Sequence, residues 1–132
     1  MADDRLIAAL DVPTRAAAEE LVARLGDSVS YYKVGMELFY ALGGDIVTWL
    51  KERQKKVFLD LKLHDIPNTV GNGLCSLLRL RPDILNVHTA GGLRMMKAAA
   101  EALHRAAAEA DISCPKLIGV TVLTSMDAED WA

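Results

Sequence analysis

Short apolar runs alternate with longer segments of helical periodicity along the whole chain. Five of the apolar runs predict β-strands, and they recur about every 25 to 30 residues, the length of a strand plus a crossover helix. This order of strands and helices is typical of an α/β fold with a parallel sheet. The expected strands are Leu6 to Leu10, Ser30 to Val34, Val57 to Leu63, Ile84 to His88 and Lys116 to Leu123.

The segments between these strands predict four helices. Arg15 to Leu25 has apolar residues on one face and is followed by Gly26, which can end a helix. Asp45 can cap a second helix, and Pro67 suits the first turn of a third. A fourth helix, rich in alanine, is expected from about Leu93 to Ala110.

Polar and charged residues follow nearly every expected strand at its carboxyl end. Because the carboxyl ends of parallel strands meet at one rim of a sheet or barrel, ligands bind there and chemistry takes place there. Charges that served only to solvate the surface would be scattered over the helices and both strand ends. The pattern therefore favours a functional site at this rim. The residues concerned are Asp11, Lys33, Asp60, Lys62, His88 and Thr124.

Acidic and basic residues are concentrated in the segment from Asp60 to Asp65, directly after an apolar run. In a regular strand, alternate side chains point to the same face, so we expect Asp60, Lys62 and His64 to share one face. Charges placed close to apolar chain must pair, and their pKa values are perturbed. An edge strand with a solvated face would show the same alternation. The polar ends of the other strands favour a site.

Composition indicates one globular domain spanning residues 1–132, with 52% hydrophobic and 25% charged residues. A net charge of -3 gives no basic surface for nucleic acid. We expect a cytoplasmic protein without a membrane partner, because no run is long enough to span a bilayer and the start of the chain does not resemble a secretion signal. Cys75 and Cys114 lie far apart without a CxxC spacing, which favours reduced thiols over a disulfide or zinc site.

Several motifs together resemble those of the bacterial orotidine 5′-monophosphate (OMP) decarboxylases. The Asp-x-Lys-x-x-Asp pattern alone also occurs in a wider group of barrel enzymes that act on sugar phosphates. The extension from His64 to Thr69, together with Lys33, favours the decarboxylases. The matching segments are Leu10-Asp11, Lys33 to Phe39, Phe58 to Thr69, Asn86-Val87-His88 and Thr121 to Ser125.

The resemblance implies a (β/α)8 TIM barrel, of which this chain would supply about five β/α units, the C-terminal units being absent. It also implies conversion of OMP to uridine 5′-monophosphate and carbon dioxide in de novo pyrimidine synthesis, without a metal or organic cofactor. In this family Lys33, Asp60, Lys62 and Asp65 form an alternating chain of charges. Lys62 would stabilise the carbanion at C6 and then give it a proton.

The resemblance further implies a homodimer with shared active sites. Asp65, Ile66 and Thr69 would reach into the site of the neighbouring subunit. Asp60 would lie beside the substrate carboxylate, and Thr124 or Ser125 would meet the pyrimidine ring. The full set of substrate-binding residues that it implies is Asp11, Lys33, Asp60, Lys62, Asp65, Ile66, Thr69 and Thr124.

Two alternatives stay open. The first is a metal-dependent lyase or decarboxylase on sugar phosphates from the same wider group. It predicts an acidic metal ligand at the rim in place of the interleaved lysines. The second is an inactive fragment that only associates or binds nucleotide, because the family's phosphate-binding loop and arginine lie in the half that this chain is expected to lack.

Overall fold

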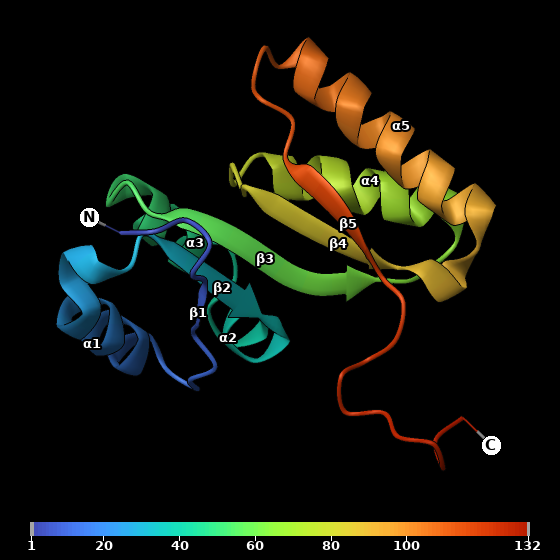
Figure 1. Cartoon of the computed structure of the whole chain (residues 1–132). Coiled ribbons are helices and arrows are strands. Elements are labelled where there is room, and N and C mark those ends of the chain that lie inside the picture. Colours follow the sequence, from blue (N-terminus) through green and yellow to red (C-terminus); the bar gives the residue numbers. More distant parts are fainter. Residues whose placement is uncertain (1, 132) are drawn as a thin grey trace.

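Five parallel strands form a single sheet in the computed structural model, which describes residues 2–131 (Figure 1). The strands lie side by side in chain order. The α/β prediction and all five predicted strands are confirmed. The strands are β1 (Ala8–Ala9), β2 (Tyr31–Gly35), β3 (Lys56–Leu63), β4 (Ile84–His88) and β5 (Lys116–Val120).

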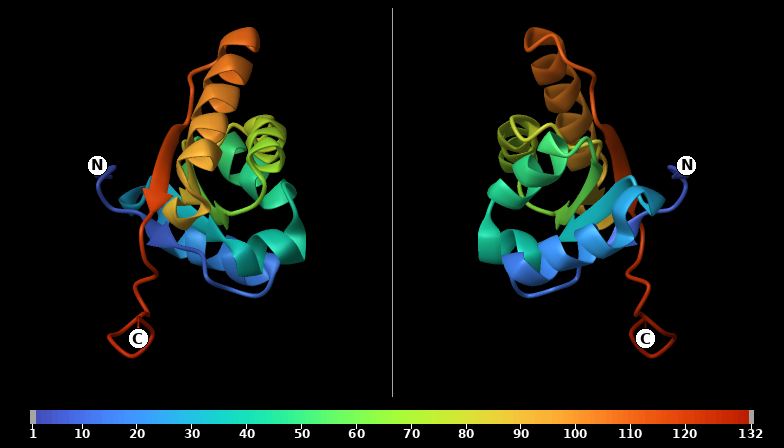
Figure 2. Two further views of the ribbon diagram at one scale, coloured as in Figure 1. Left: turned by 90° about the vertical axis from the view of Figure 1, so that its right-hand side faces the viewer. Right: turned by 90° about the vertical axis from the view of Figure 1, so that its left-hand side faces the viewer.

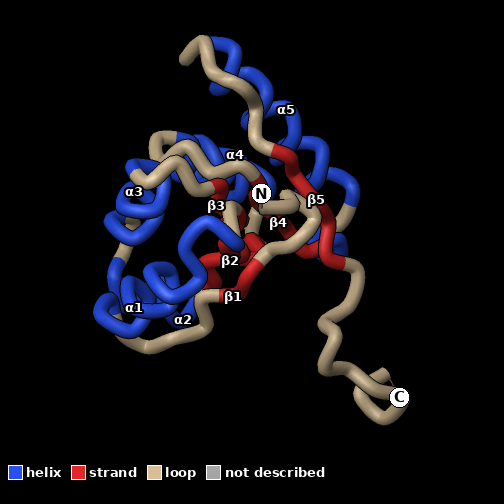
Figure 3. Tube along the Cα trace, turned by 60° about the vertical axis from the view of Figure 1, so that its left-hand side comes forward, coloured by secondary structure: helices blue, strands red, loops and turns tan. Residues whose placement is uncertain are grey.

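The helices lie on one face of this sheet (Figure 2). Crossovers between neighbouring parallel strands are right-handed, so a sheet whose strands follow chain order receives every helix on the same side. The result is a partial α/β barrel, with the helices outside and the strands inside (Figure 3). The helices are α1 (Arg15–Leu25), α2 (Met36–Leu42), α3 (Asp45–Glu52), α4 (Pro67–Leu78) and α5 (Leu93–Glu109).

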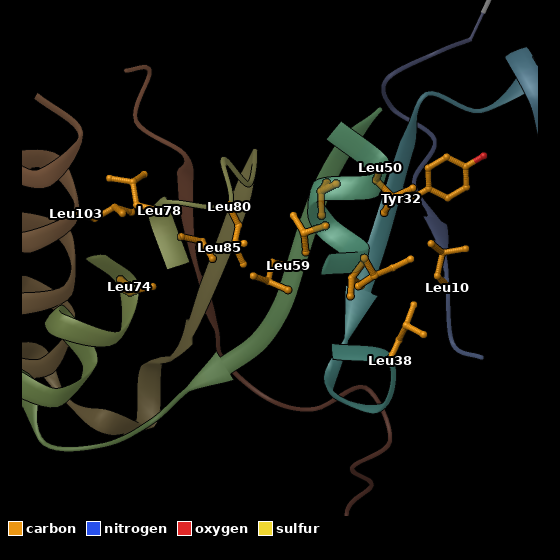
Figure 4. Packing of buried hydrophobic residues seen from close by; sticks show 14 of the residues in the cluster. Leu10, Tyr32, Leu38, Leu50, Leu59, Leu74, Leu78, Leu80, Leu85 and Leu103 are labelled. Carbon is orange, nitrogen blue, oxygen red and sulfur yellow. The ribbon is translucent and has the colours of Figure 1, made fainter. Parts of the chain in front are cut away.

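The hydrophobic core fills the space between the sheet and the helices (Figure 4). Strand residues such as Leu59 and Leu85 are fully buried against helix residues such as Leu50 and Leu74. Close packing of these apolar surfaces removes them from water and is the main stabilising contribution to the fold. It also holds the strands rigidly, which fixes the positions of the side chains at their carboxyl ends.

The predicted helix boundaries are largely confirmed, with one correction at Asp45. Thr14 caps α1 by accepting a hydrogen bond from the Ala17 amide at 3.2 Å, and Gly26 ends that helix with a φ of 51°. Pro67 occupies the first turn of α4. Asp45 is the first residue of α3 rather than its cap, a position held by Gly44.

Three elements differ in extent from the prediction. Helix α2 was not predicted, because it follows β2 directly and has only 7 residues. Strand β5 ends at Val120 rather than Leu123, because its neighbour β4 ends at His88, which pairs with Val120. Strand β1 lies at an edge and pairs only with β2, over 2 residues. No helix in residues 2–131 is long and apolar enough to cross a membrane.

Candidate active site

The candidate site is centred on Asp60, near the carboxyl end of β3. Its side chain is nearly buried, with 7% of the residue exposed. One carboxylate oxygen, Oδ1, accepts two hydrogen bonds of 2.7 Å, one from Lys62 Nζ and one from Asn86 Nδ2. A buried carboxylate with these donors is stable in its ionised form, because the bonds replace the hydration that it loses.

Lys33 brings a second positive charge to Asp60 from the neighbouring strand. Strands β2 and β3 pair so that Gly35 lies opposite Asp60. Lys33 Nζ lies 3.5 Å from Asp60 Oδ2 and 3.6 Å from Asp11 Oδ1. Side chains from three successive strand ends therefore form the alternating row Asp11, Lys33, Asp60, Lys62, whose formal charges sum to zero.

These contacts hold the pKa of the Asp60 carboxyl below its ordinary value of 3.8. Burial acts in the opposite direction and raises the pKa, because it disfavours the charged form. The hydrogen bonds from Lys62 and Asn86, together with the positive charges of Lys62 and Lys33, outweigh burial. Asp60 is therefore ionised throughout the neutral range.

The lowered pKa of Asp60 predicts an acid-sensitive contribution to stability. As the pH falls below 3.8, the unfolded chain binds a proton at this carboxyl before the folded chain does. The stabilisation is thus fully present above that value and is lost as the pH falls through the folded-state pKa. We expect Asp60→Asn to lower the free energy of unfolding at neutral pH and to have a smaller effect in acid, as measured by urea unfolding. An equal loss at every pH would contradict this.

The backbone of Lys62 departs from regular strand geometry. Its φ is 51°, in the left-handed region that non-glycine residues rarely occupy. The predicted alternation is therefore wrong beyond Asp60. His64 lies outside β3, and its ring packs against that of His88 with the ring centroids 5.5 Å apart. The turn at Lys62 nevertheless returns its ammonium group to Asp60.

Strain at Lys62 can be measured by comparing two substitutions that both remove the amine. We expect Lys62→Gly to be more stable than Lys62→Ala by about 1 kcal/mol, because only glycine adopts this backbone conformation without steric cost. Urea unfolding of both variants gives the difference. The matched control is Lys97 in α5, where glycine should be the less stable of the pair by about 1 kcal/mol. If the Gly variant were the less stable of the pair at position 62 as well as at position 97, the Lys62 backbone would not be strained.

The remaining predicted site residues do not join this row within the described chain. Asp65 is exposed, and its carboxylate accepts only from the neighbouring Ile66 amide, at 2.6 Å. Ile66 is 69% exposed, and Thr69 is exposed on the first turns of α4. Thr124 is also exposed and follows the end of β5, in the segment that leaves the sheet (Figure 1).

A hollow of about 700 Å³ lies next to Lys62. Its walls come from the ends of β3 and β4, from α2 and α4, and from the segment after β5. Several apolar side chains in it are partly exposed, among them Met36, Tyr40 and Leu123. No group of three or more His, Cys, Asp and Glu side chains suited to a metal ion occurs in residues 2–131.

Asn86 is the member of the site to which the sequence assigned no role. It is 1% exposed on β4 and contacts both Asp60 and Lys62. One signal could have found it: an amide side chain inside an otherwise apolar strand must have hydrogen-bonding partners, and the adjacent strand offered Asp60.

Comparison with known proteins identifies the family of the chain. The family described as "Orotidine 5'-phosphate decarboxylase / HUMPS family" matches residues 4–132. The chain belongs to this family. The orotidine 5'-phosphate decarboxylase of Moorella thermoacetica is 52% identical over 128 residues, which are 97% of this chain and 51% of that protein. That of Nostoc sp. is 46% identical over 132 residues, or 55% of its length.

Two solved structures share the fold of this chain. The crystal structure of orotidine 5'-phosphate decarboxylase from Lactobacillus acidophilus matches with a TM-score of 0.84 and 44% identity, covering 94% of this chain and 55% of that one. A Geobacillus kaustophilus protein described as an uncharacterized conserved protein matches with a TM-score of 0.85 and 47% identity. The chain thus spans about half the length of the curated relatives it matches.

Proposed function

We propose that this chain contributes the reaction centre for decarboxylation of OMP to uridine 5′-monophosphate. The observation that carries the proposal is the row of charges, in which the ammonium groups of Lys33 and Lys62 lie on either side of the Asp60 carboxylate at 3.5 and 2.7 Å. The names of its relatives supply the substrate class. Because the row is neutral overall and partly buried, it can keep several fixed charges in place next to a bound polar ligand.

In the proposed reaction, the bond between C6 and the carboxylate breaks and carbon dioxide leaves. The electron pair of that bond stays on C6, in an orbital that cannot delocalise into the ring carbonyls. A positive charge about 4 Å away stabilises such an anion by roughly 4 kcal/mol at an effective dielectric of about 20. Lys62 supplies this charge and then transfers one proton to C6, becoming a neutral amine.

Asp60 has two roles in this proposal. Its carboxylate holds the ammonium groups of Lys33 and Lys62 in place, as the contact distances support. It also lies beside the substrate carboxylate, so that repulsion between the two anions is relieved when carbon dioxide departs. Asp11 and Lys33 bind ribose hydroxyls, and Thr124 or Ser125 meets the pyrimidine ring.

We also propose that two copies of the chain share their sites. Asp65, Ile66 and Thr69 are exposed, and within the described residues of one copy the Asp65 carboxylate accepts a hydrogen bond only from the adjacent Ile66 amide. The neighbouring hollow exposes Met36 and Tyr40, and exposed apolar side chains of this kind are typical of an interface. A homodimer would bring Asp65 of one copy to the lysines of the other. Light scattering should then give twice the mass of one chain.

A cytoplasmic location and a single domain over residues 1–132 remain predictions. Both cysteines are free thiols, Cys114 is exposed, and a reducing compartment suits such groups. The single sheet and its continuous core support one folding unit. A single cooperative transition in urea, seen alike by fluorescence and circular dichroism, is the expected result for one domain.

The decisive experiment follows the ultraviolet absorbance of OMP when it is mixed with the chain, with and without a chelator. Turnover that is unaffected by the chelator supports the proposal. Turnover of a sugar phosphate that depends on added divalent metal would support the lyase alternative instead. Binding of uridine 5′-monophosphate in a calorimeter without any turnover of OMP would support the inactive fragment.

A further inference from the structure

The pairing between β3 and β4 changes register at the site. Leu59 pairs with Leu85, whereas Leu63 pairs with Val87, so β3 carries more residues than β4 between these two pairs. Such a bulge leaves backbone groups on the longer strand without partners in the ladder. The segment that bulges contains both Asp60 and Lys62, the central residues of the proposed reaction.

The side chain of Asn86 provides a hydrogen-bonding partner for the backbone at this bulge. The Lys62 backbone amide donates to Asn86 Oδ1 at 2.8 Å, in place of a carbonyl of β4. Asn86 Nδ2 donates to Asp60 Oδ1 at 2.7 Å. The amide can make both bonds in only one orientation, because turning it over would place its NH2 group against the Lys62 N–H. Only 1% of the Asn86 surface is exposed, so bulk water does not compete for these bonds.

We propose that Asn86 is a positioning residue for the reaction, which fixes the Asp60 carboxylate and the Lys62 backbone relative to each other. This inference rests on the proposed decarboxylation. Asn86 and Lys62 both bond to Oδ1 of Asp60, which leaves Oδ2 directed to Lys33. Asn86 thereby sets the plane of the carboxylate that separates the two ammonium groups.

Three substitutions show how the two hydrogen bonds restrict the residue at position 86. Aspartate could accept from the Lys62 amide, but it has no donor for Asp60 and adds a like charge beside it. Leucine fills a similar volume but leaves the Lys62 amide buried without a partner. Glutamine has the right groups on a longer side chain, which does not fit the space of a bulge closed by bonds of 2.7 and 2.8 Å.

The test compares Asn86→Leu and Asn86→Asp with the control Val87→Ala. Val87 is 2% exposed on the same strand and contributes to the core, so its truncation lowers stability without touching the charges. We expect both Asn86 variants to lose about 100-fold in kcat, with a smaller change in KM, because misplaced groups raise the barrier more than they weaken binding. Val87→Ala should keep the parent kcat at temperatures where it is folded.

A titration of the Asp60 carboxyl by carbon-13 NMR provides a readout that does not depend on turnover. Its pKa should rise in both Asn86 variants, since each lacks one of the hydrogen bonds that lower it, and should not change in Val87→Ala. In the unsubstituted chain, the chemical shift of the Asn86 side-chain amide should change with pH at the pKa of Asp60. This measurement uses only the unsubstituted chain, so it does not depend on whether a variant folds.

The outcomes separate the two proposals. If the chain does not decarboxylate OMP but the Asp60 pKa rises in the Asn86 variants and the Asn86 amide follows the titration, the proposed function fails and the positioning role stands. If the Asn86 amide does not follow Asp60, or if Asn86→Leu leaves both kcat and the Asp60 pKa unchanged, the positioning role is refuted whatever the activity. A loss of kcat with Val87→Ala equal to that with Asn86→Leu would assign Asn86 a merely structural role.

Discussion

Lys62→Ala is expected to abolish decarboxylation of OMP by this chain. In the proposed mechanism, the substitution removes both the charge that stabilises the carbanion and the proton that C6 receives. The charge alone is worth roughly 4 kcal/mol, or about three powers of ten in rate, and loss of the proton donor adds to it. The rate of the ultraviolet change at saturating OMP measures the effect.

Lys97→Ala is the matched control for this substitution. Lys97 is exposed on α5 and lies outside the row of charges, so its removal should leave kcat unchanged. Urea unfolding of both variants shows whether each is folded in the assay. A folded Lys62→Ala variant that retains the full rate would refute the role given to this lysine.

Mixing two inactive variants is expected to restore activity if the sites are shared between subunits. Lys62→Ala and Asp65→Ala should each be inactive as homodimers. In a mixed dimer, one site receives the intact Lys62 of one copy and the intact Asp65 of the other, while the second site lacks both. Since random reassociation makes half of the dimers mixed, about one quarter of the original activity should return.

The appropriate control mixes each variant with itself under the same unfolding and refolding conditions, which should give no activity. Titration of one variant with the other should produce a maximum at equal amounts. Failure of the mixture to regain activity, with mixed dimers demonstrated by mass spectrometry of tagged chains, would contradict the shared site. Asp65 would then act within its own subunit or not at all.

The strands could be predicted from the sequence because each is a short apolar run that packs against helices. The run from Ile84 to His88 is correct at both ends. The outer strands were predicted too long, since hydrophobicity does not show where a neighbouring strand ends and pairing stops. Helix α2 was missed, although Leu38 and Leu42 have helical spacing and Gly43, at a φ of 68°, marks its end.

The meeting of Lys33, Asp60 and Lys62 could be predicted because the carboxyl ends of adjacent parallel strands lie together. The backbone geometry that brings Lys62 to Asp60 could not be predicted. Regular alternation from Asp60 would also have placed His64 with the charges, whereas the register shift and the left-handed backbone of Lys62 end that alternation. Register depends on the partner strand, so the sequence could mark Asn86 as a buried amide in need of partners but could not show its bond to the Lys62 backbone.

The proximity of Lys62 and Asp60 bears on how the protein would recover after each cycle. In the proposed mechanism, proton transfer to C6 would leave the neutral amine of Lys62 beside the ionised Asp60 carboxylate, the two groups being 2.7 Å apart in this structure. The row Asp11, Lys33, Asp60 and Lys62 would then carry a net negative charge, which would attract a proton from solvent to the amine. The Asp60 carboxylate that positions Lys62 before bond cleavage would thus also favour reprotonation of the Lys62 amine afterwards.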